Sequence, residues 1–67
     1  MAVIKVIEIL ADSSESWEAA TQVAVTEASK TVKNIQSVFV KNFQAVVDDD
    51  NIVKYRVNVK ISFIVQG

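Results

Sequence analysis

The sequence predicts a small α+β subunit whose elements follow in the order strand, helix, strand, strand. Residues 2–10 are rich in Val and Ile, which favour strands. Residues 14–34 are rich in Ala and contain neither Gly nor Pro, as expected for a helix. Residues 52–65 alternate between apolar and polar side chains, the pattern of a strand with one covered face. We therefore expect one helix packed on one sheet, with residues 1–67 forming a single domain.

The predicted helix begins near Ser13 or Ser14, because Asp12 and Glu15 have the spacing of a capping box. Residues at three- and four-residue steps then form a narrow apolar stripe that comprises Trp17, Ala20, Ala24, Ala28, Thr31 and Ile35. Small side chains dominate this stripe, so the helix can approach a sheet closely, with Trp17 filling space at its beginning. Helical spacing makes Trp17 a core or interface residue, and stacking on a ligand is the alternative.

The second and third strands are predicted to form a hairpin over residues 35–47 and 52–65. Asp48, Asp49, Asp50 and Asn51 separate them and have high turn preference. Along the second strand, one set of alternate residues consists of Ser37, Phe39, Lys41 and Phe43, and the other of Val38, Val40 and Asn42. Along the third strand, the apolar set that should meet the helix consists of Tyr55, Val57, Val59, Ile61 and Phe63. The polar set, Arg56, Asn58, Lys60 and Ser62, should share the uncovered side of the sheet with Ser37, and we expect the functional site there.

The chain is too short to stabilise itself well as a monomer. A domain of 67 residues buries only about 60% of the surface of its unfolded chain. There is no Cys and no His, which removes disulfides and zinc sites as remedies. Hydrophobic residues make up 51% of the chain, more than so small an interior holds. We therefore expect association with further copies, with binding of a hard cation as a minor route.

Composition also excludes several functions. A net charge of −1 offers no general attraction to nucleic acid or to an anionic membrane. There is neither an apolar run near the ~20 residues of a membrane span nor an N-terminal apolar leader, so we expect a cytoplasmic protein. Without His or Cys the common nucleophilic triads cannot form, and the only Gly is Gly67, so no Gly-rich phosphate loop exists. We expect no enzyme.

Two groups of residues have an ordinary and a functional interpretation. Asp48, Asp49 and Asp50 are most simply a solvated turn, but clustered oxygen ligands in a loop also suit Ca²⁺ or Mg²⁺, which makes them the candidate metal ligands. Arg56 is most simply a surface residue in an ion pair, but inside an assembly it can hold a carboxylate or phosphate group with two parallel hydrogen bonds.

Four stretches of the sequence resemble the dodecin family. They are KVIEI in the first strand, SSESWEAA at the helix start, VKNIQSVFVKNF entering the second strand and VKYRVNVKISF in the third. The resemblance covers nearly the whole chain, in order and at matching lengths. It implies an antiparallel three-stranded sheet partly wrapped around one helix, and a homododecamer closed into a hollow sphere. That assembly would remove the shortage of core described above.

The resemblance also implies a ligand and its site. Dodecins bind and store flavins (riboflavin, FMN or FAD) between subunits. The flavin ring stacks on a Trp early in the second strand, and a Gln in the third strand hydrogen-bonds to the edge of the ring. Ser37 and Arg56 occupy those two positions here. We therefore expect a flavin-type cleft around Ser37, Phe39, Arg56 and Asn58 with weaker flavin recognition, Phe39 and Phe43 offering some stacking surface. The alternatives are a calcium-binding shell and a purely structural shell.

Overall fold

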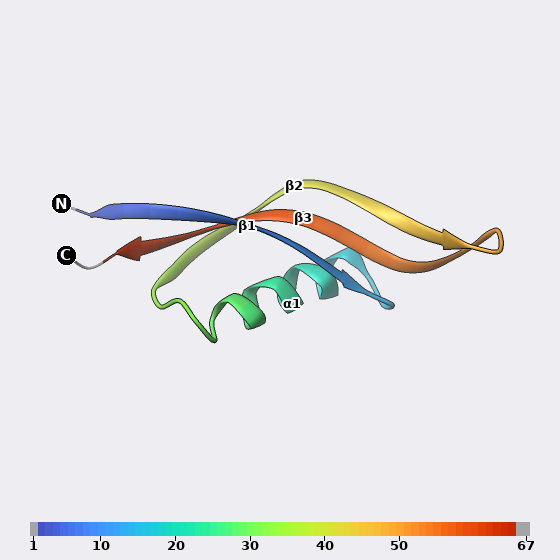
Figure 1. Cartoon of the computed structure of the whole chain (residues 1–67), viewed down its shortest axis with the longest axis horizontal. Helices are drawn as coiled ribbons and strands as arrows, with labels where there is room; N and C mark the ends of the chain where they lie inside the picture. The colour runs from blue at the N-terminus through green and yellow to red at the C-terminus, as the bar shows by residue number, and fades with distance from the viewer. Residues whose placement is uncertain (1, 66–67) are drawn as a thin grey trace.

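The computed structural model describes residues 2–65 and has the predicted order of elements. Strand β1 spans Val3–Ser13, helix α1 spans Trp17–Ala28, and strands β2 and β3 span Ile35–Asp48 and Asn51–Val65. The sheet has the order β1-β3-β2, and both strand pairs are antiparallel. Helix α1 lies along one side of this strongly twisted sheet (Figure 1). The α+β prediction is confirmed. No helix within residues 2–65 is long and apolar enough to cross a membrane.

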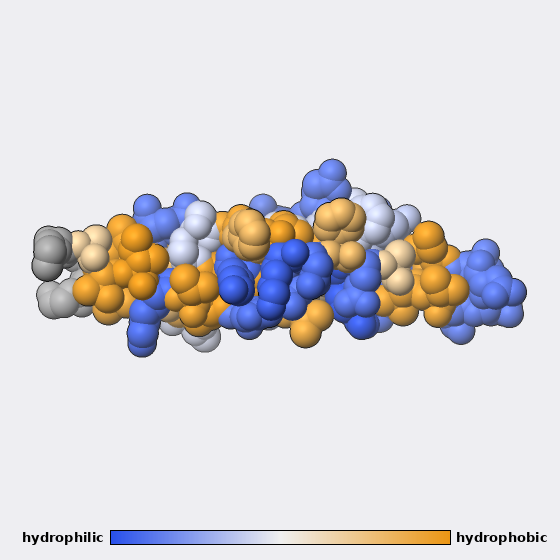
Figure 2. Space-filling model, turned by 90° about the horizontal axis from the view of Figure 1, so that it is seen from above, coloured by the Kyte–Doolittle hydropathy of each residue, from blue (hydrophilic) through white to orange (hydrophobic). Residues whose placement is uncertain are grey.

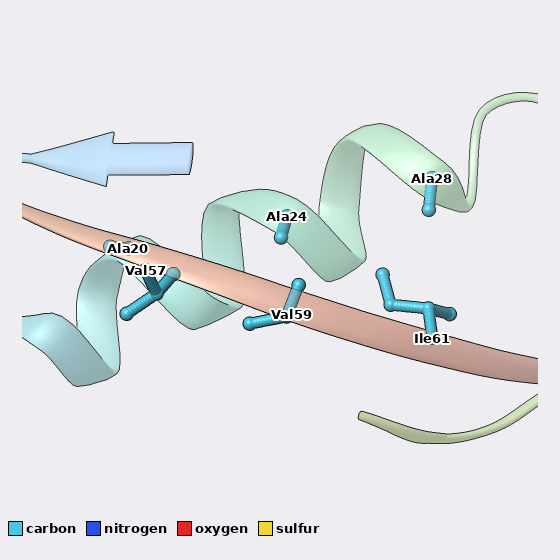
Figure 3. Close-up of a cluster of buried hydrophobic side chains, with 6 residues drawn as sticks. All are labelled: Ala20, Ala24, Ala28, Val57, Val59 and Ile61. Atoms are coloured by element: carbon cyan, nitrogen blue, oxygen red, sulfur yellow. The ribbon is translucent and has the colours of Figure 1, made fainter. Parts of the chain in front are cut away.

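The core is formed by small side chains of α1 and β-branched side chains of β3. Its members are at most 4% exposed and comprise Ala20, Ala24, Ala28, Val57, Val59 and Ile61. The alanines of α1 are directed toward the three residues of β3 (Figure 3). Because Ala has only a methyl group, the helix can lie close to the sheet and leave no gap to be filled. The predicted covered face of the third strand is confirmed.

The helix begins later than predicted. Ser16 is its N-cap: the backbone there is extended, and the Ser16 Oγ accepts a hydrogen bond from the Ala19 N–H at 2.9 Å. The predicted capping box of Asp12 and Glu15 is wrong, because β1 continues through Asp12, which is paired with Arg56 of β3. Strand pairing provides hydrogen-bond partners for the backbone N–H and C=O groups of this segment, so the helix starts only after β1 has ended.

The helix also ends earlier than predicted, at Ala28 rather than near Asn34. Thr31 lies in a turn and is exposed, so it is not part of the apolar stripe. Thr and Val have low helix propensity, and Asn34 adopts the left-handed region with φ of 63°, which Asn tolerates better than most residues. These residues turn the chain toward Ile35, where β2 begins.

The hairpin turn is confirmed and has two central residues. Asp48 pairs with Asn51, and both Asp49 and Asp50 have positive φ, at 52° and 63°. Positive φ at both central residues defines the type I′ turn, whose twist matches that of the flanking strands. The pairing of β1 with β3 stops at Ser13 and Tyr55, so the hairpin extends beyond β1 as an arm (Figure 1).

A β-bulge in β2 overturns part of the predicted alternation. Val40 pairs with Val59 and Asn42 pairs with Asn58, which leaves Lys41 as an extra residue. An extra residue reverses the faces of all residues that follow it. The prediction that Phe43 shares the side of Ser37 and Phe39 is therefore wrong.

Phe43 instead lies on the helix side and packs on Trp17. Their ring centroids are 5.2 Å apart, and Trp17 also meets Tyr55 edge-on at 4.9 Å. The Trp17 indole N–H donates a hydrogen bond to the Gln44 carbonyl at 3.0 Å. Trp17 thus fastens the start of the helix to the hairpin, as the ordinary interpretation of its spacing predicted.

Candidate functional site: the open face of the sheet

The side of the sheet opposite α1 is not covered by any part of residues 2–65. We call it the open face. It is formed by Ile4, Val6, Glu8, Leu10 and Asp12 of β1, Lys54, Arg56, Asn58, Lys60 and Ser62 of β3, and Ser37, Phe39, Lys41, Asn42 and Gln44 of β2. Its centre is hydrophilic and lies between two apolar regions, one toward each end of the molecule (Figure 2).

All four predicted ligand residues lie on the open face, but they form a row rather than a cluster. Ser37 is hydrogen-bonded to the Ser62 hydroxyl, and Phe39, 63% exposed, lies opposite Lys60. Asn58 lies between Leu10 of β1 and Asn42 of β2. Arg56 is six residues from Ser62 along β3, or roughly 20 Å at the rise of a strand. One protomer therefore does not bring Ser37 and Arg56 to one small ligand.

Charged side chains cross the centre of the open face. Lys41 of β2 reaches over β3 to Glu8 of β1, with Nζ and Oε2 3.4 Å apart. Hydrogen bonding from the Asn58 side chain and, next, the positive charge of Lys41 lower the pKa of Glu8 from its ordinary value. Glu8 is thus held as a carboxylate, with Lys60 as its neighbour on β3.

The Asn58 side chain carries an acceptor without a partner. Its Oδ1 is buried and accepts no hydrogen bond from the described residues. A buried acceptor left unpaired costs about 1–3 kcal/mol. A donor from a ligand or a neighbouring copy would remove this cost, so Asn58 is a natural point of contact for either.

Arg56 borders a hollow at the arm side of the open face. The hollow has a volume of about 370 Å³ and is lined by Leu10, Ala11, Asp12 and Arg56. The Arg56 Nη2 lies 3.6 Å from the Asp12 Oδ2, and both side chains are a little more than one third exposed. Volumes of this size are common for sites that bind small molecules.

The sequence did not single out three residues of this face as ligand contacts. Asp12 was assigned to a helix cap, although the first strand continues through it to Ser13. Leu10 was assigned to the first strand but not to a site, and Asn42 was placed on the other side because the bulge has no compositional signal. A longer first strand would have placed Asp12 on the side of Leu10, because residues two apart in a strand share a face.

The acidic turn lies at the exposed tip of the arm. Within residues 2–65 no three His, Cys, Asp or Glu side chains converge in a group able to hold a metal ion. Asp48, Asp49 and Asp50 are adjacent in sequence, and the left-handed backbone of the last two is explained by the turn itself. Their role as metal ligands remains a prediction.

The chain matches the sequence model of the Dodecin family over residues 3–66. It belongs to the dodecin family. A curated relative from Mycobacterium tuberculosis, named calcium dodecin, is 36% identical over 63 residues, which are 94% of this chain and 89% of that protein. These matches confirm the resemblance that the four sequence stretches indicated.

Solved dodecin structures confirm the fold. A protein from Thermus thermophilus superposes with a TM-score of 0.94 at 27% identity, covering 100% of this chain and 98% of its own. A variant of T. thermophilus dodecin gives 0.93 with complete coverage of both chains. The M. tuberculosis calcium dodecin, described as calcium chelating with a novel calcium-binding site, gives 0.84 at 34% identity, with 96% and 91% covered.

Proposed function

We propose that this dodecin is the subunit of a closed homododecameric shell that binds and stores a small ligand at contacts between open faces, without catalysis. The observation that carries the proposal is the exposed apolar surface that adjoins the polar centre of the open face toward both ends of the molecule. The polar centre provides recognition. The apolar ends provide surface that a second copy can bury.

Several large apolar side chains are more than half exposed toward both ends of the molecule. At one end Ile4 and Val6 of the open face are 60% and 57% exposed, and Val3, on the other side of β1, is 61% exposed. On the arm, Val47 and Ile52 are 60% and 57% exposed; their pair follows that of Val46 with Lys54, so they lie on the helix side of the sheet. Apolar side chains that gather on an exposed surface mark interaction sites. Since Ser37 and Arg56 are roughly 20 Å apart within one protomer, contact between copies is also the way to bring both residues to one ligand.

Flavin is the ligand class that the family suggests, and its binding should be weak here. Among residues 2–65, Phe39 is the only aromatic side chain on the open face, and Ser37 provides no ring at the family's stacking position. Each aromatic contact adds about 0.5–1.5 kcal/mol beyond the area that it buries. Loss of one ring on each side of a flavin therefore weakens binding by about 1–3 kcal/mol, or roughly 5- to 160-fold.

Native mass spectrometry of the purified protein tests both parts of this proposal. We expect twelve copies, with retained small-molecule mass at fewer than one ligand per subunit. Ile4→Lys with Val6→Lys should break the assembly into smaller species, because charges would be buried at the apolar end. Gln36→Lys with Ser29→Lys, which adds the same charge at two other exposed positions, should leave the number of subunits in the assembly unchanged. A wild-type monomer would refute the proposal.

Calcium binding is the second candidate, favoured by the similarity to the M. tuberculosis calcium dodecin. Asp48, Asp49 and Asp50 are the oxygen ligands that this chain offers in one exposed turn. Calorimetric titration with Ca²⁺ should then show saturable binding that Asp48→Asn with Asp50→Asn removes. Glu15→Gln with Glu18→Gln, near the start of α1, is the control. Binding that survives the turn variant would place the ion elsewhere.

A further inference from the structure

The two ends of the molecule carry opposite charges. The turn at the tip of the arm carries three carboxylates, those of Asp48, Asp49 and Asp50. Between residues 45 and 55 the only positive residue is Lys54, and it lies on the open face. The other end, which we call the tail, carries Lys5 of β1 and Lys33 of the loop that joins α1 to β2. Figure 1 shows the turn and this loop toward opposite ends of the longest axis, which measures 50 Å. The arm tip and the tail cannot meet within one chain, so their charges can attract only another molecule.

Strand pairing holds the two lysines of the tail at the same level of the sheet. Phe63 of β3 pairs with Lys5 on one side and with Ile35, the first residue of β2, on the other. Lys33 precedes Ile35 by two residues, and the backbone carbonyl of the residue between them accepts a hydrogen bond from β3. Both lysines are exposed, and within residues 2–65 neither has an ionic partner. Val3 shares the helix side of β1 with Lys5 and is 61% exposed, so the tail is both positive and apolar.

The helix side of the arm is apolar and uncovered. Val47 and Ile52 form a pair on this side and are 60% and 57% exposed. Phe43, 63% exposed, continues the apolar surface toward Trp17. The pairing of β1 stops at Tyr55 and α1 begins at Trp17, so no element within residues 2–65 covers the arm beyond them. The arm thus presents an apolar surface that ends in three carboxylates.

We propose that the arm of one copy docks head-to-tail on the tail of a second copy of this chain. The carboxylates of the turn then face Lys5 and Lys33, while Val47 and Ile52 are buried against the apolar part of the tail. A symmetric contact is disfavoured, because arm against arm opposes carboxylates to carboxylates and tail against tail opposes lysines to lysines. Head-to-tail contacts are heterologous, and they form a ring when their rotation closes. This inference rests on the proposed association of copies and adds a contact outside the open face.

Charge reversal tests the contact through the stability of the assembly. Asp48→Lys with Asp50→Lys reverses the arm, and Lys5→Glu with Lys33→Glu reverses the tail. Each pair of substitutions opposes like charges, so we expect the protein concentration at half-assembly to rise at least tenfold, measured by analytical ultracentrifugation at low ionic strength. The chain with all four substitutions opposes unlike charges again and should return to within threefold of the wild type. No recovery in that chain, or no effect of either reversal alone, would overturn the inference.

Cross-linking covers the case that a reversed variant does not fold, and it is specific because the chain has no Cys. Asp48→Cys with Lys33→Cys places one thiol on the arm and one on the tail. A short bismaleimide should join these thiols between successive copies, so we expect denaturing gels to show covalent species of three or more chains. Gln22→Cys with Lys33→Cys moves the first thiol to an exposed position on α1 and should give at least tenfold less of them. Equal yields from the two chains would overturn the inference.

The proposed shell and this contact fail separately in these experiments. Twelve copies whose arm and tail thiols do not link would refute the contact and leave the shell standing. Arm-to-tail links in an assembly of another size would refute the dodecamer and support the contact. A wild-type monomer would refute both.

Discussion

The two faces of strand β3 are built from alternate residues and have opposite properties. Val57, Val59 and Ile61 point at α1 and are fully buried. Arg56 and Asn58 point the other way, beside charged and amide side chains of β1 and β2. The covered face thus provides the stability of the protomer, whereas the open face is left for contacts outside it. A strand that serves both purposes leaves little freedom of register, since a slip of one residue exchanges the two faces.

A one-residue shift within β3 is the strongest way to break this division. Inserting one Ala between Val59 and Lys60 reverses the faces of all residues on one side of the insertion, so polar side chains must meet α1. We expect the largest loss of thermal stability of any change discussed here. Deleting Lys41 is the control: it removes the extra residue of the bulge and leaves Val40 and Asn42 opposite the adjacent residues Val59 and Asn58, so every face is kept. Similar melting temperatures for the two variants would show that the register of β3 does not define the faces.

Truncation within the covered face should be the next most damaging change. Ile61→Ala leaves a cavity beneath α1 and should lower the free energy of unfolding by about 2–5 kcal/mol. Val23→Ala, on an exposed part of the same helix, should change it by less than about 0.5 kcal/mol. Urea unfolding at one fixed protein concentration measures both, because association shifts apparent stability. Equal losses would mean that the helix-covered face is not the dominant core.

The helix cap gives an intermediate effect on the covered side. Ser16→Ala removes the hydrogen bond to the Ala19 N–H and should cost about 1 kcal/mol. Ser14→Ala, two residues earlier and exposed, should have almost no effect. The same urea experiment distinguishes them. A larger effect at Ser14 would restore the earlier helix start that the sequence suggested.

The smallest expected effect concerns Glu8 on the open face. Its carboxyl should titrate by NMR below the ordinary pKa of 4.5. Since folding lowers this pKa, the associated stability is present above the unfolded pKa and is lost as the pH falls through the folded pKa. Asn58→Leu should raise the pKa of Glu8 more than Lys41→Met does. Glu8→Gln should remove this part of the acid dependence of melting, and a pKa at or above 4.5 would contradict the assigned contacts.

Features with a periodic signal could be predicted from the sequence. Alternation along residues 52–65 was sufficient to identify the covered face, and the alanine spacing identified the helix surface that packs there. The three aspartates before Asn51 were sufficient for the turn, because few residues tolerate positive φ. Each of these signals lies within a short stretch of the chain, so it can be recognised in a single sequence.

The rest depends on contacts between distant segments. Asp12 has the sequence context of a helix cap, and only its pairing with Arg56 shows that it belongs to β1. The bulge has no residue signature, so Phe43 and Asn42 were assigned to the wrong sides. The hollow likewise requires two strands from opposite ends of the chain. Sequence identified Arg56 as a candidate but not Asp12, its ionic partner.

The two-residue turn also has a consequence for the folding pathway. Strands β2 and β3 are joined by Asp49 and Asp50 alone, so their contacts close short loops and can form early. Strand β1 must instead pair with residues near the other end of the chain, at a larger loop-closure cost. We therefore expect the hairpin to be structured in the folding transition state and β1 to dock afterwards. The hollow between β1 and Arg56 would then appear only at the last step, so incompletely folded chains lack it.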